Sequence, residues 1–116
     1  MGSESEPSAD DVHEARARQR PASVDVADYE PASELLKALT SATRLALVEL
    51  LAEGPRCVHE LVDALDVAQP LVSQHLKTLR AARIVSTSRR GREVVYRLED
   101  DHVHGVIREL LAHTRE

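Results

Sequence analysis

The chain of 116 residues has very few aromatic residues: it contains no phenylalanine, no tryptophan and two tyrosines. Its core must therefore be built from leucine, valine and alanine, a composition that favours helices. The only cysteine, Cys57, excludes a disulfide within the chain and fits a reducing compartment. The length predicts one small domain, and 42% hydrophobic residues suffice for its core.

Long hydrophobic runs are also missing from the sequence. No segment approaches the ~18 apolar residues needed to cross a membrane, and no charged start followed by an apolar stretch marks a signal peptide. We therefore expect a cytoplasmic protein with no membrane partner. The sequence also shows no serine or cysteine with a paired base, no glycine-rich phosphate loop and no open catalytic metal site, so an enzyme is not expected.

Charge is distributed unevenly along the chain. Residues 1–30 hold eight acids against three arginines, whereas the remainder is neutral overall. Within residues 69–97, seven basic residues stand against a single acid, Glu93, and this local positive charge indicates a polyanionic partner. Residues 1–28, rich in Ser, Pro, Ala and charge, are expected to form a disordered acidic tail, and residues 29–116 a folded domain.

Apolar spacing after Tyr29 predicts four helices in succession. The second is capped by Thr40 or Ser41, the third spans roughly 58–65, and the fourth begins with a Gln-Pro pair that places proline in its first turn. Only three residues separate the third helix from the fourth, and the fourth is polar and basic on its outer side. The pair therefore predicts a helix-turn-helix.

Two β-rich runs, 84–88 and 93–98, flank a turn at 89–92 and predict a hairpin. A helix-turn-helix followed by a hairpin is a winged helix, so the expected fold is mainly α with a small β-hairpin. We expect it to form a homodimer through its first and last helices and to bind double-stranded operator DNA. The candidate DNA-contacting residues are Gln69, Ser73, Gln74, His75, Lys77, Arg89, Arg90 and Arg92.

Two parts of this DNA-binding surface have a second interpretation. Arginines in a turn usually form a solvated surface, but the basic fourth helix beside these favours DNA. His75 lies one residue before Leu76, and this position fits a contact to DNA and a half-buried structural role equally well.

Four side chains able to bind a metal lie near the end of the sequence: Asp100, His102, His113 and Glu116. On one helix, His102 and His113 differ by about 20° in azimuth but lie ~16 Å apart along the axis. One ion with ligand bonds of ~2 Å cannot contact both from a single helix. If the helix packs antiparallel against its copy across a twofold axis, residues near the start of one helix lie beside residues near the end of the other. Asp100 and His102 of one copy then meet His113 and Glu116 of the other, which makes two sites per dimer.

The residues expected to pack the two last helices together are Val103, Val106, Ile107, Leu110 and Leu111, with Gly105 permitting close approach. His104 faces away from His102 and is expected to lie outside the metal site. The alternative is that Asp100 or Asp101 simply caps the helix, and that its other end is a solvated turn.

These motifs resemble the ArsR/SmtB family of metal-sensing repressors over residues 30–116. The resemblance rests on the segments 57–61 and 69–79, on Gly91-Arg92 with Tyr96 behind it, and on the pattern D-x-H, ten residues, H-x-x-E. That last pattern is similar to the zinc-sensing branch, which implies that its four residues bind zinc and that zinc releases the apo dimer from its operator. The O, N, N, O ligand set suits Zn²⁺ and, less selectively, Co²⁺ or Ni²⁺.

A second set of candidate metal ligands consists of Cys57, His59 and Glu60, with His13 of the tail as a further ligand. By resemblance, Cys57 takes the place of the first cysteine of a C-x-C metal site. His59 replaces the second, so a thiolate-rich site for arsenic, cadmium or lead is not expected. A buried, inert Cys57 is the favoured alternative. For the whole protein, the competing function is a winged-helix DNA-binding protein with no metal effector.

Overall fold

The computed structural model describes residues 23–116, and the part of the predicted tail at residues 1–22 lies outside that range. The described chain begins with a short 3-10 helix, η1 (Val26–Tyr29), capped by the Asp25 carboxylate, which accepts a hydrogen bond from the Ala27 N–H. Regular structure thus starts ahead of the expected boundary at residue 29, because Asp25 supplies a local cap within a charge-rich stretch.

Two α-helices follow η1: α2 (Glu30–Lys37) and α3 (Ala42–Ala52). Of the two caps that the sequence allows for α3, Ser41 is the one used, since its Oγ accepts a hydrogen bond from the Arg44 N–H. Helix α3 contributes buried residues to the core, whereas α2 has none, and its Leu36 is 51% exposed. The protomer therefore leaves part of the apolar face of α2 uncovered.

The predicted helix-turn-helix consists of α4 (Val58–Leu65) and α5 (Gln69–Ala81). The turn between them begins at Asp66, whose backbone is left-handed at φ 54°. Ala68 provides no side-chain cap for α5, and Pro70 lies in the first turn of that helix, as expected. Three regularly spaced side chains of α5 are fully buried: Val72, Leu76 and Leu79.

The wing is formed by β2 (Val85–Arg90) and β3 (Glu93–Leu98). The sequence placed a turn at 89–92, but the turn is shorter. Arg89 and Arg90 continue β2 because they pair with Val94 and Glu93 of β3. The tip consists of Gly91, at φ 65°, and Arg92.

A third strand, β1 (Arg56–Cys57), was missed in the sequence because two residues are too few to show an alternating pattern. It pairs antiparallel with β3, so the sheet has the order β1-β3-β2. Cys57 lies opposite Val95 in this register, and α4 begins at the next residue. The start of the helix-turn-helix is thereby joined to the wing.

The last helix, α6 (His102–Thr114), packs against α3. Its Ile107 is 1% exposed and belongs to the core of the protomer, with Val103 and Leu111 packed against that core. The expectation that all five apolar residues of α6 face a second copy is therefore wrong, because three of them cover the protomer's own core. Val106 and Leu110 remain 51% and 52% exposed.

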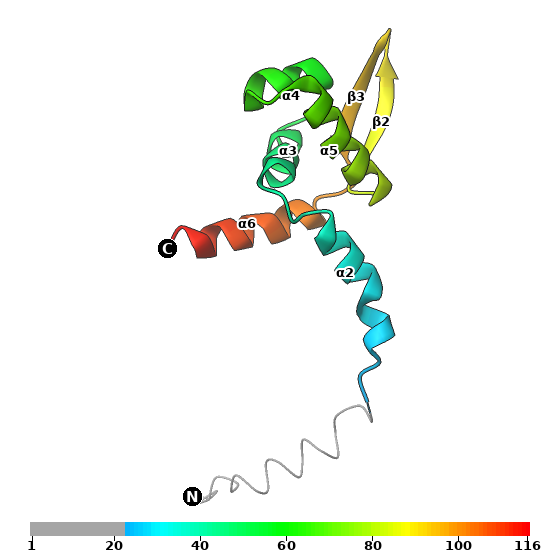
Figure 1. Cartoon of the computed structure of the whole chain (residues 1–116), viewed down its shortest axis with the longest axis vertical. Coiled ribbons are helices and arrows are strands. Elements are labelled where there is room, and N and C mark those ends of the chain that lie inside the picture. The colour runs from blue at the N-terminus through cyan, green and yellow to red at the C-terminus, as the bar shows by residue number, and fades with distance from the viewer. Residues whose placement is uncertain (1–22) are drawn as a thin grey trace, which may run out of the picture.

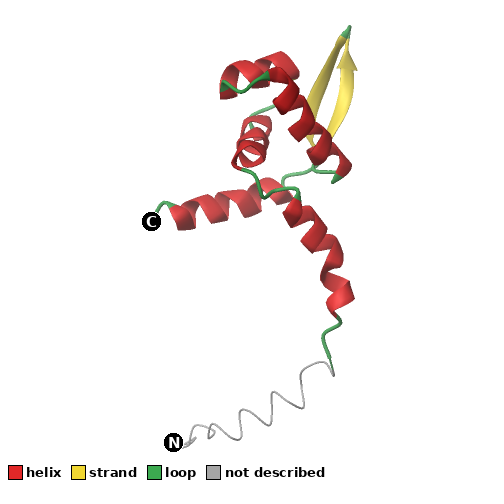
Figure 2. Ribbon diagram, viewed as in Figure 1, coloured by secondary structure: helices red, strands yellow, loops and turns green. Residues whose placement is uncertain are grey.

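The helix-turn-helix and the wing form the body of the molecule, and α2 and α6 extend away from it on the side remote from the wing tip (Figure 1). Loops between the elements are short, as Figure 2 shows. Within residues 23–116, no helix is both long enough and apolar enough to span a membrane.

Candidate nucleic-acid interface and metal centres

The outer face of α5 carries the polar residues that the sequence assigned to DNA. Gln69, Ser73, Gln74 and Lys77 are all exposed, opposite the buried face of the helix. Leu71 also lies on the exposed surface, at 48% exposure, and was missed because only polar and basic side chains of this helix were taken as candidates. An exposed apolar side chain on this face is of the kind that can contact a thymine methyl group.

His75 is the exception on α5, because it is only partly exposed and has a protein partner. Its Nδ1 lies 3.1 Å from a terminal guanidinium nitrogen of Arg44 on α3. Arginine only donates, so Nδ1 accepts and the ring proton belongs on Nε2. Arg44 Nε also donates to the Ala38 carbonyl at 2.6 Å. Arg44 thus connects the end of α2 to α5, and His75 has the structural role that the sequence left open beside DNA contact.

The wing presents its arginines to solvent. Arg89, Arg90 and Arg92 are exposed, and Arg97 donates a hydrogen bond to Ser88 Oγ at 3.3 Å across the hairpin. With the basic residues of α5, these side chains give a positively charged surface over the helix-turn-helix and the wing. Such a surface binds phosphate without reading sequence.

At the start of α6, the structure brings two of the four predicted metal ligands together. Asp100 Oδ1 accepts a hydrogen bond from the His102 N–H at 2.9 Å and lies 3.3 Å from His102 Nδ1. Two ligands of one tetrahedral zinc ion lie roughly 3.4 Å apart, given bonds of ~2.0–2.2 Å. Asp100 therefore caps the helix and is also spaced for shared metal binding with His102.

The other two predicted ligands, His113 and Glu116, lie at the far end of α6 and are exposed. Since α6 is one continuous helix, His113 remains about 16 Å from His102 along the axis. A single protomer therefore does not bring the four residues together.

His104, which was expected to face away from the metal site, points toward α3. Its Nε2 lies 2.7 Å from Glu49 Oε1, and the imidazole is largely buried with 21% of its side chain exposed. The contact fixes α6 to the helix that precedes the helix-turn-helix.

A second cluster of metal-ligating side chains lies where β1, α4 and β3 meet. Cys57 Sγ, a ring nitrogen of His59 and a carboxylate oxygen of Glu93 lie within 4.8 Å of one another. The sequence had identified Cys57 and His59 but missed Glu93, because the unpredicted strand β1 is what places β3 beside them. His13, proposed as a further ligand, lies outside the described residues.

Glu60, the third residue of that predicted set, binds Cys57 instead of standing free. Its Oε1 accepts from the Cys57 thiol at 2.9 Å and from the Cys57 backbone N–H at 3.1 Å. The backbone bond and the reciprocal bond from the Glu60 N–H to the Cys57 sulfur form a capping box at the start of α4. Burial raises the pKa of the Cys57 thiol, and the hydrogen bond to Glu60 raises it further. The same thiol hydrogen bond, followed by that from the backbone, lowers the pKa of Glu60. Cys57 is thus a buried residue whose thiol is hydrogen-bonded to Glu60.

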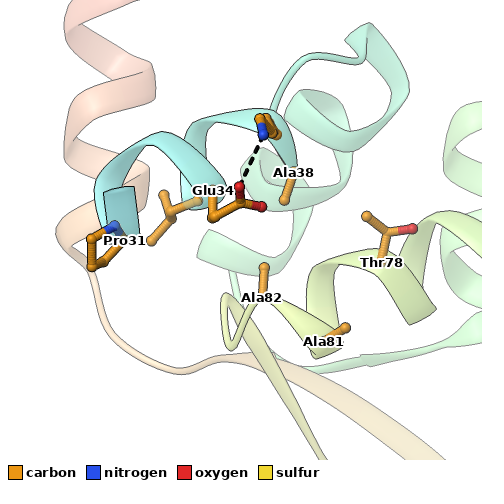
Figure 3. A pocket seen from close by; sticks show the side chains of 8 residues that line it. Pro31, Glu34, Ala38, Thr78, Ala81 and Ala82 are labelled. Carbon is orange, nitrogen blue, oxygen red and sulfur yellow. Dashed lines mark hydrogen bonds and ion pairs between the residues drawn. The ribbon is translucent and has the colours of Figure 1, made fainter. Parts of the chain in front are cut away.

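Two hollows of the described surface carry no catalytic constellation. A cavity of about 440 Å³ lies between α2 and the end of α5, lined chiefly by small and apolar side chains with Glu34 paired to Lys37 (Figure 3). A second, of about 510 Å³, lies between α3, α4 and the end of α6. Neither is lined by histidine or cysteine.

Residues 41–87, which hold the helix-turn-helix and the start of the wing, match the model of the bacterial regulatory protein arsR family. A transcriptional repressor SmtB homolog of Synechocystis is 36% identical over 90% of this chain and 80% of its own length. The chain belongs to the arsR family. This family and the winged-helix fold are those of DNA-binding transcription regulators and not of enzymes.

Other members of the arsR family and its fold support the same assignment. The HTH-type transcriptional repressor SmtB of Mycobacterium tuberculosis is 55% identical over 87 residues, 75% of this chain, and the match spans 64% of that repressor's length. A homodimeric winged helix-turn-helix DNA-binding domain from Mycobacterium bovis superposes with a TM-score of 0.70, covering 84% of this chain and 92% of that domain. Its identity of 24% supports the fold alone.

Proposed function

We propose that this arsR-family chain is a metal-responsive repressor whose metal-free homodimer binds operator DNA and releases it when zinc binds between the subunits. Each of two sites takes Asp100 and His102 from one copy, with His113 and Glu116 of the partner subunit. The relatives named as SmtB repressors support the repressor part of this proposal. The metal part depends on the geometry of α6.

The observation that carries the proposal is the exposed face of α6. Val106 and Leu110 lie within about 80° of the azimuth of His102, whereas Ile107 lies about 140° away. The helix therefore has one face in the core and another, 51–52% exposed at its apolar residues, that bears a histidine at each end. An antiparallel copy would cover the apolar pair and bring opposite ends of the two helices together.

Helix α2 supplies a second surface for the same dimer. It is amphipathic, buries none of its residues and exposes half of Leu36. Like α6, it extends from the side of the body remote from the wing tip, but in a different direction (Figure 1). A dimer formed through α2 and α6 leaves both recognition helices and both wings uncovered, as binding to one operator requires.

The donor set fits a zinc ion. Two imidazole nitrogens and two carboxylate oxygens, all from exposed side chains, give four protein ligands without any thiolate. Asp100 and His102 already have the spacing of two ligands of one ion. When bound, zinc supplies a link between the two α6 helices, and four protein ligands leave it no open position for hydrolysis.

The contact between His104 and Glu49 connects this link to the DNA-binding surface. It joins α6 to α3 at 2.7 Å, and α3 packs against both α4 and α5. A change in how two α6 helices meet therefore moves each helix-turn-helix with its α3. Because zinc and DNA favour different dimer arrangements, each must weaken the other by the same factor.

The operator is read by α5 and held by the wing. Gln69, Ser73 and Gln74 offer hydrogen-bonding groups to base edges, whereas Lys77 and the arginines of β2 and the wing tip contact phosphate. This division accounts for an exposed polar helix beside an exposed basic hairpin.

The proposal is tested with operator DNA selected from a random-sequence pool by the metal-free full-length chain. Fluorescence anisotropy then measures affinity for the selected duplex as buffered zinc is added. We expect zinc to weaken binding about 5- to 150-fold, the usual range of allosteric coupling. Asp100→Asn should retain DNA binding, since asparagine still caps α6, but lose most of the zinc response.

Asp101→Asn is the matched control, because Asp101 is exposed beside Asp100 and its side chain makes no capping hydrogen bond. It should respond to zinc as the native chain does. Unchanged DNA affinity of the native chain across the zinc series would favour the winged-helix protein without a metal effector. Equal responses of the two variants would exclude Asp100 as a ligand.

A further inference from the structure

We propose that the imidazole of His75 donates a hydrogen bond from Nε2 to a phosphate of the DNA backbone, and that Arg44 is the residue that positions it. The three groups form a chain in which the Arg44 guanidinium donates to His75 and His75 donates to the phosphate. This inference rests on the DNA-binding part of the proposed function and deepens it, and it requires no metal.

The contact with Arg44 decides which ring nitrogen of His75 carries the proton. A terminal guanidinium nitrogen of Arg44 lies 3.1 Å from His75 Nδ1, and Nδ1 must accept because arginine only donates. In a neutral imidazole the proton then belongs to Nε2. Within residues 23–116, the only hydrogen-bond partner of the His75 ring is Arg44. The Nε2–H group is therefore available to an acceptor on another molecule.

The charge of Arg44 has no counterion in the described part of the chain. The side chain is only partly exposed, and its partners there are the His75 ring and the Ala38 carbonyl, both uncharged. None of the ion pairs within residues 23–116 includes Arg44. A phosphate bound through His75 would bring a negative charge toward this cation. Donation into Nδ1 also polarises the ring, which makes Nε2–H a stronger donor.

His75 lies at the border between the buried face and the outer face of α5. Leu71, His75 and Leu79 are spaced four residues apart, so each differs from the next by about 40° in azimuth. Exposure falls along this row: Leu71 is 48% exposed, His75 is partly exposed and Leu79 is fully buried. A recognition helix in the major groove presents its central face to the bases, and the phosphate backbones run along its flanks. The position of His75 therefore favours a phosphate over a base.

The hydrogen bonds of Arg44 hold the donor in place before DNA arrives. The Nε of Arg44 donates to Ala38 at 2.6 Å, and its backbone N–H donates to Ser41 Oγ at 3.3 Å. A side chain that is already ordered loses little conformational entropy when it binds. In the alternative, the pair of Arg44 and His75 only holds α5 against α3, and Nε2 contributes nothing to DNA affinity.

Two substitutions of His75 separate these alternatives. In His75→Asn, the side-chain oxygen can replace Nδ1 and accept from Arg44, but no group replaces Nε2. With the metal-free full-length chain, we expect this variant to bind the selected operator and a random duplex about 10- to 150-fold more weakly, the effect of losing a hydrogen bond to a charged group. His75→Gln is the matched variant, since its longer side chain carries an amide N–H near the position of Nε2, and it should recover most of the affinity. Urea unfolding of each variant checks that the fold is kept.

Operators with one phosphate at a time replaced by an uncharged methylphosphonate locate the contact. At the phosphate bound by His75, the native chain should lose affinity and His75→Asn should lose little. At the other phosphates, the two chains should respond equally. Equal responses at every phosphate, or native affinity in His75→Asn, would overturn the proposal.

Nitrogen-15 spectra of the His75 ring test the role of Arg44. The native ring should be protonated at Nε2, the signal of that nitrogen should shift when duplex is added, and Arg44→Lys should allow the other tautomer to appear. A native ring protonated at Nδ1, or a shift with inorganic phosphate at the same ionic strength but not with duplex, would overturn the proposal. All measurements are made without metal, so failure of the zinc response does not alter their outcome.

Discussion

The imidazole of His104 on α6 and the carboxylate of Glu49 on α3 meet with Nε2 and Oε1 2.7 Å apart, although 55 residues separate them in the chain. The two groups join the proposed metal-binding helix to the helix that supports the helix-turn-helix. A side-chain contact between two packed helices is one route by which a change in one helix can shift the other, and its coupling is testable.

Glu49→Gln should therefore reduce the coupling between zinc binding and DNA binding. The affinity for zinc alone and the affinity for DNA alone should stay nearly unchanged. The neutral amide weakens a charge-assisted hydrogen bond, so the factor by which zinc lowers DNA affinity should fall about two- to thirtyfold, equivalent to roughly 0.5–2 kcal/mol. Anisotropy with and without zinc measures that factor. Glu53→Gln, which loses a more exposed pair with Arg56 at 3.7 Å, should retain the native factor. Equal factors in the two variants would remove His104 and Glu49 from the pathway.

The wing arginines should act through phosphate. Arg90→Ala or Arg92→Ala should lower affinity for any duplex and reduce the slope of log affinity against log salt by about one unit each. Titrations of a specific and a random duplex over a range of salt concentrations measure both effects. Weaker binding on the specific duplex alone, with an unchanged slope, would mean that the wing reads bases.

Substitutions on the outer face of α5 should have the opposite effect: they should change sequence discrimination more than the salt dependence of binding. Gln74→Ala should relax discrimination between specific and random duplexes by about 1–3 kcal/mol with little change in the salt slope. Arg44→Lys should act indirectly, because it disturbs His75 without contacting the outer face. A competition assay with single-base operator variants distinguishes the two: only Gln74→Ala should alter the preference at a particular base.

The hydrogen bonds from Cys57 to Glu60 predict that the stability of the fold depends on pH. They lower the pKa of Glu60, so its carboxylate stabilises the fold above its ordinary pKa, and that stabilisation is lost as the pH falls through the lowered value. Urea midpoints of the metal-free chain, measured between about pH 7 and about pH 3, should fall less for Glu60→Gln than for the native chain. Identical pH profiles would show that the capping box survives protonation.

The symmetry of the proposed zinc sites gives a test by mixing. His102→Ala and His113→Ala homodimers should each lose both inter-subunit sites, because each site needs one residue from each position. In a heterodimer of the two variants, one site lacks both histidines and the other is complete. High-affinity zinc binding should return at one ion per heterodimer, with partial release from DNA. A verified heterodimer that stays unable to bind zinc would place the ligands within single chains.

Cys57→Ser tests whether Cys57 takes part in the zinc response. The variant should keep zinc-dependent release from DNA, with a modest loss of stability from altering a residue that is 5% exposed. Anisotropy under the same zinc series measures the release. Loss of the response in a folded, DNA-binding variant would move the regulatory site from α6 to α4.

Much of this fold could be predicted from local patterns of the sequence. The bounds of α4 were predicted correctly, and α5 begins at Gln69 as expected, because a Gln-Pro pair and regular apolar spacing mark helix ends and faces within a few residues. The outward position of Gln69, Ser73 and Gln74 follows from the same spacing. The four candidate ligands of residues 100–116 could also be listed in advance, but their convergence depends on a second copy.

Contacts between segments far apart in the chain could not be predicted from local sequence patterns. Val106 and Ile107 are both apolar, and only packing of α6 against α3 puts Ile107 in the core and leaves Val106 exposed. His75 gained its partner Arg44 from another helix. Strand β1, two residues long, carries no periodic signal, yet its pairing with β3 places Glu93 beside Cys57. The sequence by itself determined the helices and their polar faces, since these depend on neighbours in the chain; tertiary packing decided which faces stay uncovered and which ligands meet.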